Sequence, residues 1–300
     1  MAEFKPLELS DMDLFHKYLG EYSFSTYEYT FLTLYIWRKM CNVAYSIIDD
    51  ALIIKKSTKS TGSYFMQPLG YTKESLKNIV IKLDEIRKSR TDFKSLFRDV
   101  ELPFINELID NFGYNICICE DVNNFDYIYS SKQLISLSGR KYHRKKNLYN
   151  QFIKKYHYEV RELHDKYVIK DCIDFAEDWY YSREKKDEQL GFELESIKDI
   201  LANREILNIK GIAVYVDGRI AGFSIGEKAN SKMAIVHIEK GNLEYTGIYS
   251  FLNKTLVEKY FKDVNFINRQ EDLGIAGLRK AKMSYNPVRL EKKFIVDLSL

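Results

Sequence analysis

The chain has 300 residues, and this length predicts two domains, because a single domain usually contains about 100–200 residues. Hydrophobic residues make up 45% of the sequence and charged residues 30%, which excludes a wholly disordered chain, and only 4 prolines and 14 glycines exclude a collagen-like one. The net charge is +3, but residues 138–166 carry nine basic and three acidic groups, so this segment is expected to attract an anionic partner or to form a solvated basic face.

No targeting or membrane-spanning segment is predicted. Residues 1–11 lack the apolar core of a signal peptide, and no stretch approaches the ~20 apolar residues that a membrane span needs. We therefore expect a cytoplasmic protein, or one peripheral to the membrane, with reduced thiols. Cys117 and Cys119 alternate on a predicted strand and are expected on an apolar core face. Their spacing does not suit zinc, so no metal site is predicted.

The first half of the chain alternates strand-like and helix-like segments. Asp49 and Asp50 separate two β-rich runs and predict a hairpin, and apolar residues at helical spacing predict a helix over 73–89. In chain order we expect a strand at 4–9, helices at 13–22 and 30–40, a hairpin at 43–56, a strand at 62–70, a helix at 73–89, a strand at 93–100, a helix at 103–113 and a strand at 114–120.

The second half repeats this order of elements. Asp217 and Gly218 form the clearest two-residue hairpin turn in the sequence. We expect a basic helix at 134–156, a strand at 158–163, helices at 169–185 and 193–203, a hairpin at 211–228, a strand at 232–242, a helix at 247–262, a strand at 264–272, a helix at 273–285 and a strand at 289–298.

The repeated order predicts an α+β fold with two mixed sheets flanked by helices, divided into domains at 1–128 and 129–300. A hairpin followed by strand, helix, strand, helix and strand resembles an N-acetyltransferase-like (GNAT) domain, so two tandem GNAT-like domains are expected. The first is expected to be degenerate and to lack a donor site, because Pro68, Leu69 and Gly70 stand where a phosphate-binding loop would lie.

The GNAT resemblance implies that a helix beginning near residue 248 binds the donor through its backbone N–H groups. The family writes the preceding turn as Gln/Arg-x-x-Gly-x-Gly/Ala. Gly247 fits this pattern, whereas the carboxylate of Glu244 would repel a pyrophosphate and Tyr249 would hinder its close approach. We expect Gly247, Ile248 and Tyr249 to contact the donor, with CoA a weaker candidate. The alternative is that Gly247 only starts a helix.

Two further stretches are candidates for binding. Residues 139–147 are basic and aromatic, which suits RNA or another polyphosphate. Residues 268–285 place charged groups where a strand ends and a helix begins, and are expected to form one wall of the cleft unless they are only a capped helix. The candidate donor- and substrate-binding side chains are Arg140, Lys141, Arg144, Lys145, Asn268, Arg269, Arg279, Lys282 and Tyr285.

Three side chains are candidates for proton transfer. His237 and Glu239 alternate on a predicted strand and should face the same side, where either could take a proton from an attacking amine or hydroxyl. The alternative for His237 is a buried structural role. Asp272 is expected to cap the helix at 273–285, which leaves Glu271 free for function with Arg269 as its charge partner.

Three segments, QPLG (67–70), 125–152 and 267–287, resemble the DUF2156 family and are similar to the C-terminal cytosolic domain of phosphatidylglycerol lysyltransferases. The resemblance implies a tandem GNAT fold related to the Fem peptidyltransferases. It implies transfer of an aminoacyl group from aminoacyl-tRNA, as co-substrate, to a small amine, hydroxyl or lipid-headgroup acceptor. The alternatives are an acetyl-CoA-dependent N-acetyltransferase and a non-catalytic protein that binds RNA or polyphosphate.

Overall fold

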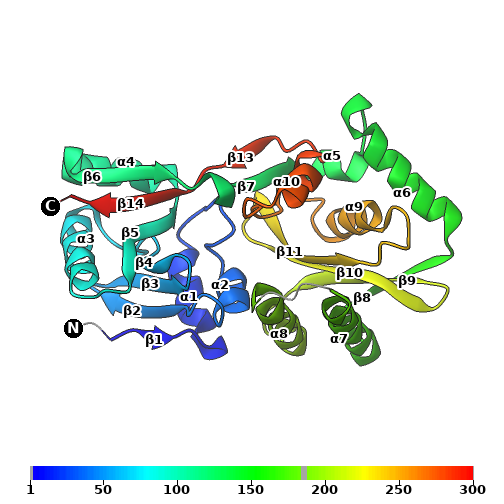
Figure 1. Cartoon of the computed structure of the whole chain (residues 1–300), viewed down its shortest axis with the longest axis horizontal. Coiled ribbons are helices and arrows are strands. Elements are labelled where there is room, and N and C mark those ends of the chain that lie inside the picture. Colours follow the sequence, from blue (N-terminus) through cyan, green and yellow to red (C-terminus); the bar gives the residue numbers. More distant parts are fainter. Residues whose placement is uncertain (1–2, 184–187, 300) are drawn as a thin grey trace. The chain divides into compact units, whose positions relative to one another are not determined.

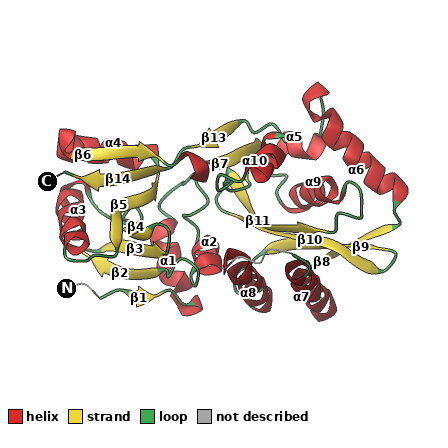
Figure 2. Cartoon of the chain, viewed as in Figure 1, coloured by secondary structure: helices red, strands yellow, loops and turns green. Residues whose placement is uncertain are grey.

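Each of the two compact units of the chain is built on one seven-stranded mixed sheet with helices packed on it (Figures 1 and 2). The computed structural model describes residues 3–183 and 188–299. The first unit combines residues 1–125 with 291–300, and the second comprises residues 126–290. The C-terminal segment therefore lies with the first unit, which differs from the expected division at 128/129.

The first unit has the strand order β1-β2-β3-β4-β5-β14-β6. β4 and β5 are parallel, and the other neighbours are antiparallel. The strands are β1 (Lys5–Pro6), β2 (Ala44–Ile48), β3 (Ala51–Thr58), β4 (Gly62–Phe65), β5 (Phe93–Val100), β6 (Ile116–Glu120) and β14 (Phe294–Leu298), and the α-helices are α1 (Met12–Leu19), α2 (Phe31–Trp37), α3 (Lys73–Lys88) and α4 (Leu102–Phe112).

Local sequence explains the elements of this unit that were predicted best. Asp49 and Asp50 both adopt positive φ, as a two-residue hairpin turn requires, and β2 pairs with β3 across them. The hydroxyl of Thr72 accepts the N–H of Ser75 and caps α3. The helical apolar spacing of α3 buries Leu76, Ile79, Val80 and Leu83 in a core that also contains side chains of α4, β5 and β14.

The second unit has the strand order β13-β7-β12-β11-β10-β9-β8, in which β11 and β12 are parallel. Asp217 and Gly218 form the predicted turn between β9 and β10. The strands are β7 (Asp126–Ser130), β8 (Tyr158–Glu162), β9 (Lys210–Val216), β10 (Arg219–Lys228), β11 (Met233–Gly241), β12 (Phe266–Asn268) and β13 (Arg289–Glu291), and the α-helices are α5 (Ser131–Ser136), α6 (His143–Lys155), α7 (Lys166–Tyr181), α8 (Glu188–Ala202), α9 (Ile248–Tyr260) and α10 (Ala276–Met283).

Helices cover both faces of the second sheet. α9 lies on one face, where its apolar side chains join those of β9, β11 and β12 in one core, and α5 and α6 pack against α9. α7 and α8 lie on the opposite face, below β10 in the view of Figure 1. Among the described residues, no helix has both the length and the apolar character needed to cross a membrane.

The prediction of a single basic helix over residues 134–156 is wrong. α5 ends at Ser136, because Leu137 adopts a left-handed conformation with φ 46° and Gly139 has φ 86°. Arg140 and Lys141 then form a short 3₁₀ turn, and α6 begins at His143. Arg140 and Arg144 therefore belong to different elements, whereas one continuous helix would have placed them on the same face.

The strand expected at 289–298 is two strands, β13 and β14, which belong to different sheets. The strand expected at 264–272 is shorter in the structure, where it is β12. The sequence analysis did not predict β7, although its residues Tyr127, Ile128 and Tyr129 are buried. The expectation that Cys117 and Cys119 lie on a core face is also wrong. Both thiols are free and exposed, because they lie opposite Asp297 and Ile295, whereas the side chains of β14 that enter the core are Phe294, Val296 and Leu298.

Candidate functional site

A cleft opens in the second unit where its two parallel strands separate. β11 and β12 pair only as far as Ile235 and Asn268, after which β11 continues to Gly241 and β12 ends. The buried side chain of Asn268 accepts the N–H of Gln270 at 2.7 Å and donates to Asp126 at 2.8 Å, and Gln270 has φ 60°. These contacts turn the chain away from β11 and leave a cavity of about 600 Å³.

Side chains from distant parts of the second unit line this cavity. They come from α6, α8, β11, the turn before α9, the first turn of α9, the end of β12 and α10. The lining residues are Lys145, Leu148, Glu193, Val236, His237, Glu239, Leu243, Tyr245, Thr246, Gly247, Ile248, Tyr249, Ser250, Arg269, Gln270, Leu278, Ala281, Lys282 and Tyr285.

The first turn of α9 forms one end of the cleft, as expected for Gly247, Ile248 and Tyr249. Gly247 precedes the helix with φ 90°, and a Cβ atom there would lie 2.1 Å from the carbonyl oxygen of Leu148. Only glycine permits both the backbone conformation and this close packing of α9 on α6. The positive end of the helix dipole therefore lies at the cavity, where it favours an anionic or carbonyl oxygen.

His237 and Glu239 both line the cleft, as predicted from their alternation on one strand. Nε2 of His237 lies 2.9 Å from Oε1 of Glu227, and the side-chain amide of Gln270 lies 3.3 Å from Nδ1. An N–H at Nε2 satisfies both contacts, because Nδ1 then accepts from the amide. Both ring nitrogens thus have partners within the protein, which favours an orienting role for His237 over that of a base.

Glu239 and Arg269 form an ion pair across the cleft, with Oε1 of Glu239 2.9 Å from Nη2 of Arg269. Both side chains are largely buried. The pairing expected between Arg269 and Glu271 is therefore wrong. Arg269 comes from the strand end that faces β11, so the carboxylate opposite it on β11 is its partner.

Lys145 is a basic lining side chain that makes no ion pair and no hydrogen bond among the described residues, although the carboxylate of Glu239 acts on its charge. Its Nζ lies 3.7 Å from the centre of the Tyr285 ring, over which the guanidinium of Arg269 also lies, at 4.6 Å. Burial, reinforced by the charges of Arg269 and Arg144, lowers the pKa of Lys145 to about 8. Lys145 is thus a partly buried cation available to an anionic ligand.

Lys282 and Tyr285 line the cleft as predicted, whereas three other residues of the same stretch do not. Arg279 is exposed and forms a two-pronged ion pair with Asp272, at 2.7 and 2.9 Å. Asp272 also accepts the N–H of Gly274, but the residue before α10 is Ile275, which makes no side-chain cap, so the predicted capping role is wrong. The prediction that Asn268 and Arg279 face the cavity is also wrong.

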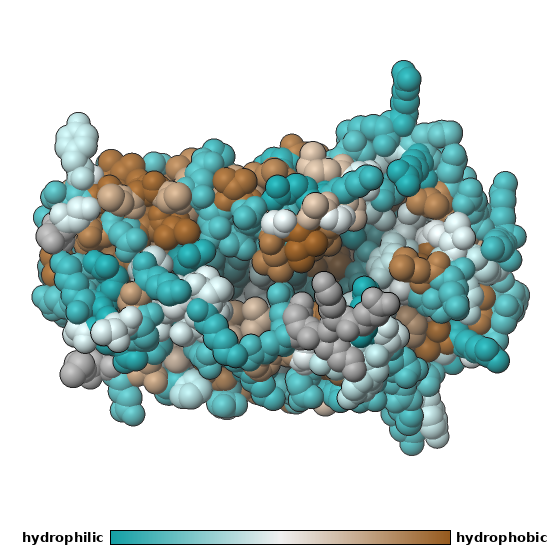
Figure 3. All heavy atoms as spheres, viewed as in Figure 1, coloured by the Kyte–Doolittle hydropathy of each residue, from teal (hydrophilic) through white to brown (hydrophobic). Residues whose placement is uncertain are grey.

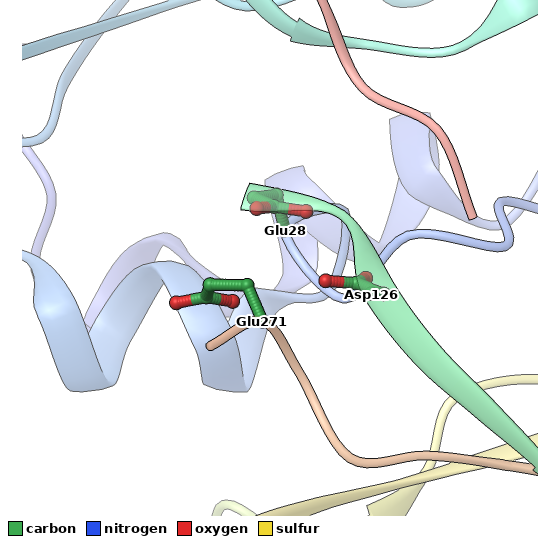
Figure 4. Close-up of side chains that lie close together, drawn as sticks. All are labelled: Glu28, Asp126 and Glu271. Atoms are coloured by element: carbon green, nitrogen blue, oxygen red, sulfur yellow. The ribbon is translucent and has the colours of Figure 1, made fainter. Parts of the chain in front are cut away.

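Glu271 does not line the cavity either. Its carboxylate lies within 4.8 Å of that of Asp126 in the same unit (Figure 4). Figure 4 also labels Glu28, which belongs to the first unit. Within that unit its carboxylate pairs with the buried amine of Lys293. The positions of Asp126 and Glu271 give no support to a catalytic role for Glu271 in the cleft.

Arg140, Lys141 and Arg144 are exposed and lie outside the cavity lining, so of the four basic candidates at 140–145 Lys145 alone reaches the cleft. Among the residues that sequence reasoning missed, Gln270 stands within the candidate stretch and could have been selected as a polar residue at a strand end. Glu193 could not have been found in this way. It reaches the cleft from α8 and forms an ion pair with Lys240 at 2.6 Å.

A second cavity, of about 810 Å³, is bordered by Leu243, which also lines the cleft. Asp171, Asp174 and Asp178 of α7 line it together with Glu244. Cations of the protein already lie over two aromatic rings of its lining: Arg183 and Lys240 over Trp179, and Arg161 over Tyr215. The four carboxylates outnumber the two lining arginines, Arg183 and Arg219, so the cavity favours a cationic group by its charge.

The family model described as "Phosphatidylglycerol lysyltransferase, C-terminal" matches residues 20–297. An uncharacterised protein of Mycoplasmoides gallisepticum is 25% identical over 174 residues, which is 58% of this chain and 56% of that protein. The chain thus aligns with little more than half of this relative's length.

Solved structures agree with the family model. A conserved protein of unknown function from Bacteroides thetaiotaomicron has a TM-score of 0.90 and 29% identity over 99% of this chain and 100% of that one. L-PGS from Bacillus licheniformis has a TM-score of 0.68 and 14% identity over 98% and 93%. A tandem GNAT protein from the clavulanic acid pathway and FemX share the fold, with TM-scores of 0.53 and 0.62 at 10% and 11% identity over 98% or more of each chain. The α+β fold of two GNAT-like units is thereby confirmed.

Proposed function

Because this chain belongs to the family of C-terminal domains of phosphatidylglycerol lysyltransferases, we propose that it transfers an aminoacyl group from aminoacyl-tRNA to an amine or hydroxyl acceptor. The family and the fold indicate an acyltransferase. The donor and the acceptor are our proposal. The observation that carries it is the cleft at the N-terminus of α9, into which Lys145 brings a positive charge that forms no ion pair among the described residues.

The charge distribution favours a long polyanionic donor. Arg140, Lys141 and Arg144 are exposed and precede Lys145 by a few residues, so cations stand on the surface as well as in the cavity. Surface cations of this kind attract a nucleic acid by releasing its counterions, whereas a small donor would need only the cavity. Tyr249 lines the cleft where the CoA-binding pattern has a small residue, which counts against CoA.

In the proposed reaction the acceptor attacks the ester carbonyl carbon of the aminoacyl group. A C–N or C–O bond forms, the ester C–O bond breaks, and the proton of the acceptor passes to the departing ribose oxygen. The backbone N–H groups at the start of α9 would stabilise the oxyanion, and Lys145 would hold a donor phosphate. The ion pair of Glu239 with Arg269, and His237 beside it, would orient the groups, so that much of the catalysis is positioning.

The acidic second cavity suggests which aminoacyl groups are accepted. Its four carboxylates outnumber Arg183 and Arg219 in the lining, so the cavity would favour an aminoacyl group or an acceptor that carries an extra positive charge. The carboxylates are those of Asp171, Asp174, Asp178 and Glu244. A lysyl group fits this description, and a neutral aminoacyl group such as alanyl would gain less. The same cavity could instead hold a cationic acceptor amine. The experiment therefore offers both kinds of acceptor, a lipid headgroup and a soluble amine.

The test is to incubate the full chain with tRNA carrying labelled lysine or labelled alanine, and separately with acetyl-CoA. Each donor is offered with phosphatidylglycerol vesicles and with a soluble amine. Loss of aminoacyl-tRNA above the spontaneous rate, with label appearing in one acceptor, supports the proposal. Release of CoA thiol without aminoacyl loss indicates the acetyltransferase, and binding of tRNA without turnover indicates the binding protein.

Two adjacent lysines supply matched variants for this test. Lys145→Gln removes the cation that lines the cleft, while Lys146→Gln removes an exposed cation of the same helix that does not line it. Transfer should fall sharply for the first variant and little for the second. Equal losses would assign the effect to general surface charge.

A further inference from the structure

One of the four sheet edges lacks the protection that the other three carry. β6 reads Ile-Cys-Ile-Cys-Glu and contains no proline and no charge before its last residue. An exposed edge strand of this kind is a template for pairing with another chain, and natural proteins usually guard such edges with charge, proline or short length. The guards of the other edges are Lys5 and Pro6 in the two-residue β1, Glu159, Arg161 and Glu162 in β8, and Arg289 and Glu291 in β13.

The outer side of β6 offers a regular row of backbone groups. Within the described part of the first unit, β6 pairs with β14 alone. The N–H of Asp121 donates to Lys293 and the carbonyl of Asn115 accepts from Ser299, each at 2.9 Å, so odd-numbered residues direct their backbone groups at β14. Backbone groups alternate sides along an antiparallel strand, so those of Ile116, Ile118 and Glu120 point outward.

The surroundings of this edge are apolar. Figure 3 shows hydrophobic side chains gathered over the region of α4 and β6 at the upper left. Glu120 is matched by Lys292 at 2.5 Å within the same unit, so the strand presents little unbalanced charge. The exposed large apolar residues of α4, β6 and their flanking turns are Leu102, Ile109, Tyr114, Ile118 and Val122.

We propose that β6 is a dimerisation edge and that its partner is β6 of a second copy of this chain, antiparallel to it. A two-fold axis through Ile118 makes the strand complementary to itself. It places residue 118 opposite residue 118 of the second copy and residue 116 opposite residue 120, so every outward backbone group has a partner. The pair at Ile118 is then hydrogen-bonded. This argument depends on the strand alone and not on the proposed aminoacyl transfer.

The same register makes a prediction about the two exposed cysteines. Cys117 of one copy lies opposite Cys119 of the partner subunit, at a non-hydrogen-bonded position where Cα atoms are about 4.5 Å apart. This separation lies within the range of about 4.4–6.8 Å that a disulfide spans. The thiols therefore report the register, since an oxidant should join Cys117 to Cys119 of the partner subunit.

The experiment treats the full chain with diamide, which takes two protons and two electrons from each pair of thiols as the disulfide forms and is reduced to a hydrazine. The native chain should give a covalent dimer on a non-reducing gel. Cys117→Ser and Cys119→Ser should each abolish it, because each variant alone removes both bridges. An equimolar mixture of the two variants should restore one bridge in mixed dimers. Cys41→Ser is the control that should keep the dimer.

The register is overturned if either single variant, Cys117→Ser or Cys119→Ser, cross-links as well as the native chain. It is also overturned if the equimolar mixture of the two variants forms no cross-linked dimer. The dimer itself is tested without oxidation by sedimentation in reducing buffer. Ile118→Lys places two like charges together at the two-fold axis and should weaken association at least tenfold. Ile206→Lys changes an isoleucine 56% exposed in the second unit and should leave association unchanged. A native chain that is monomeric at high micromolar concentration overturns the proposal.

Discussion

The charge of Lys145 gives the cleft a pH dependence that can be measured directly. The pKa of Lys145 is lowered from 10.5 to about 8, first by burial and then by the charges of Arg269 and Arg144. The folded protein therefore carries this ammonium below about pH 8 and loses it as the pH rises further. If Lys145 holds a donor phosphate, the dissociation constant for tRNA should be flat below pH 8. It should then rise by up to about tenfold per pH unit above it.

The size of the effect follows from the contact. A hydrogen bond to a charged group contributes about 1.5–3 kcal/mol, and about 1.4 kcal/mol corresponds to a factor of ten. Lys145→Gln should thus raise the dissociation constant roughly 10- to 100-fold at pH 7 and remove the rise above pH 8. Lys145→Arg keeps its charge at all these pH values, so it should also remove the rise while retaining more of the affinity.

The assay is fluorescence anisotropy of end-labelled tRNA between pH 6 and pH 9.5 at constant ionic strength, with circular dichroism to confirm that each variant is folded. Lys146→Gln is the matched control and should keep both the affinity within about threefold and the native pH profile. The reasoning is refuted if Lys145→Gln binds as tightly as the native chain, or if it weakens with pH as the native chain does.

Three further changes test the site and its support. Burial opposes the charge of Asp272, but hydrogen bonds from Arg279, Tyr127 and Gly274 lower its pKa to about 2. Asp272→Asn should therefore lower the unfolding free energy by about 1–2 kcal/mol at pH 7, and this difference should shrink below pH 4. The measurement is urea unfolding followed by the fluorescence of Trp179, with Trp37→Phe introduced into both the reference protein and the variant. Gly247→Ala should lower the unfolding free energy by about 2–4 kcal/mol, because residue 247 has a positive φ and the new Cβ would lie 2.1 Å from the carbonyl oxygen of Leu148. Gly277→Ala is the control, because nothing lies near its Cβ position, and it should be neutral or slightly stabilising. The third change replaces the exposed cations Arg140, Lys141 and Arg144 with Gln and should leave the thermal unfolding temperature unchanged. The slope of log K for tRNA binding against log salt concentration should become shallower by up to about one for each phosphate that is no longer neutralised. A slope equal to that of the native chain would indicate that these residues form only a solvated face.

Local patterns were enough to predict much of the fold. The hairpin turns at Asp49–Asp50 and Asp217–Gly218, the helical spacing of α3 and the alternation of His237 and Glu239 depend on neighbours within a few residues, and the structure contains all of them. The boundaries that were missed, such as the end of α5 at Leu137, arise where a single backbone conformation overrides a favourable helical pattern.

Long-range pairing decided the rest. Spacing predicted that Arg269 would pair with the nearby Glu271, but the separation of β11 from β12 brings Glu239 to it instead. It also predicted four similar basic residues at 140–145, of which only Lys145 is carried into the cleft by the packing of α6 on α9. The last strand pairs within the first unit although it follows the second in sequence. The sequence by itself determined the types of local element and the chemistry available, because these depend on adjacent residues. The tertiary structure alone decided which side chains meet, because those contacts join residues far apart in the chain, and the spacing of neighbours carries no information about them.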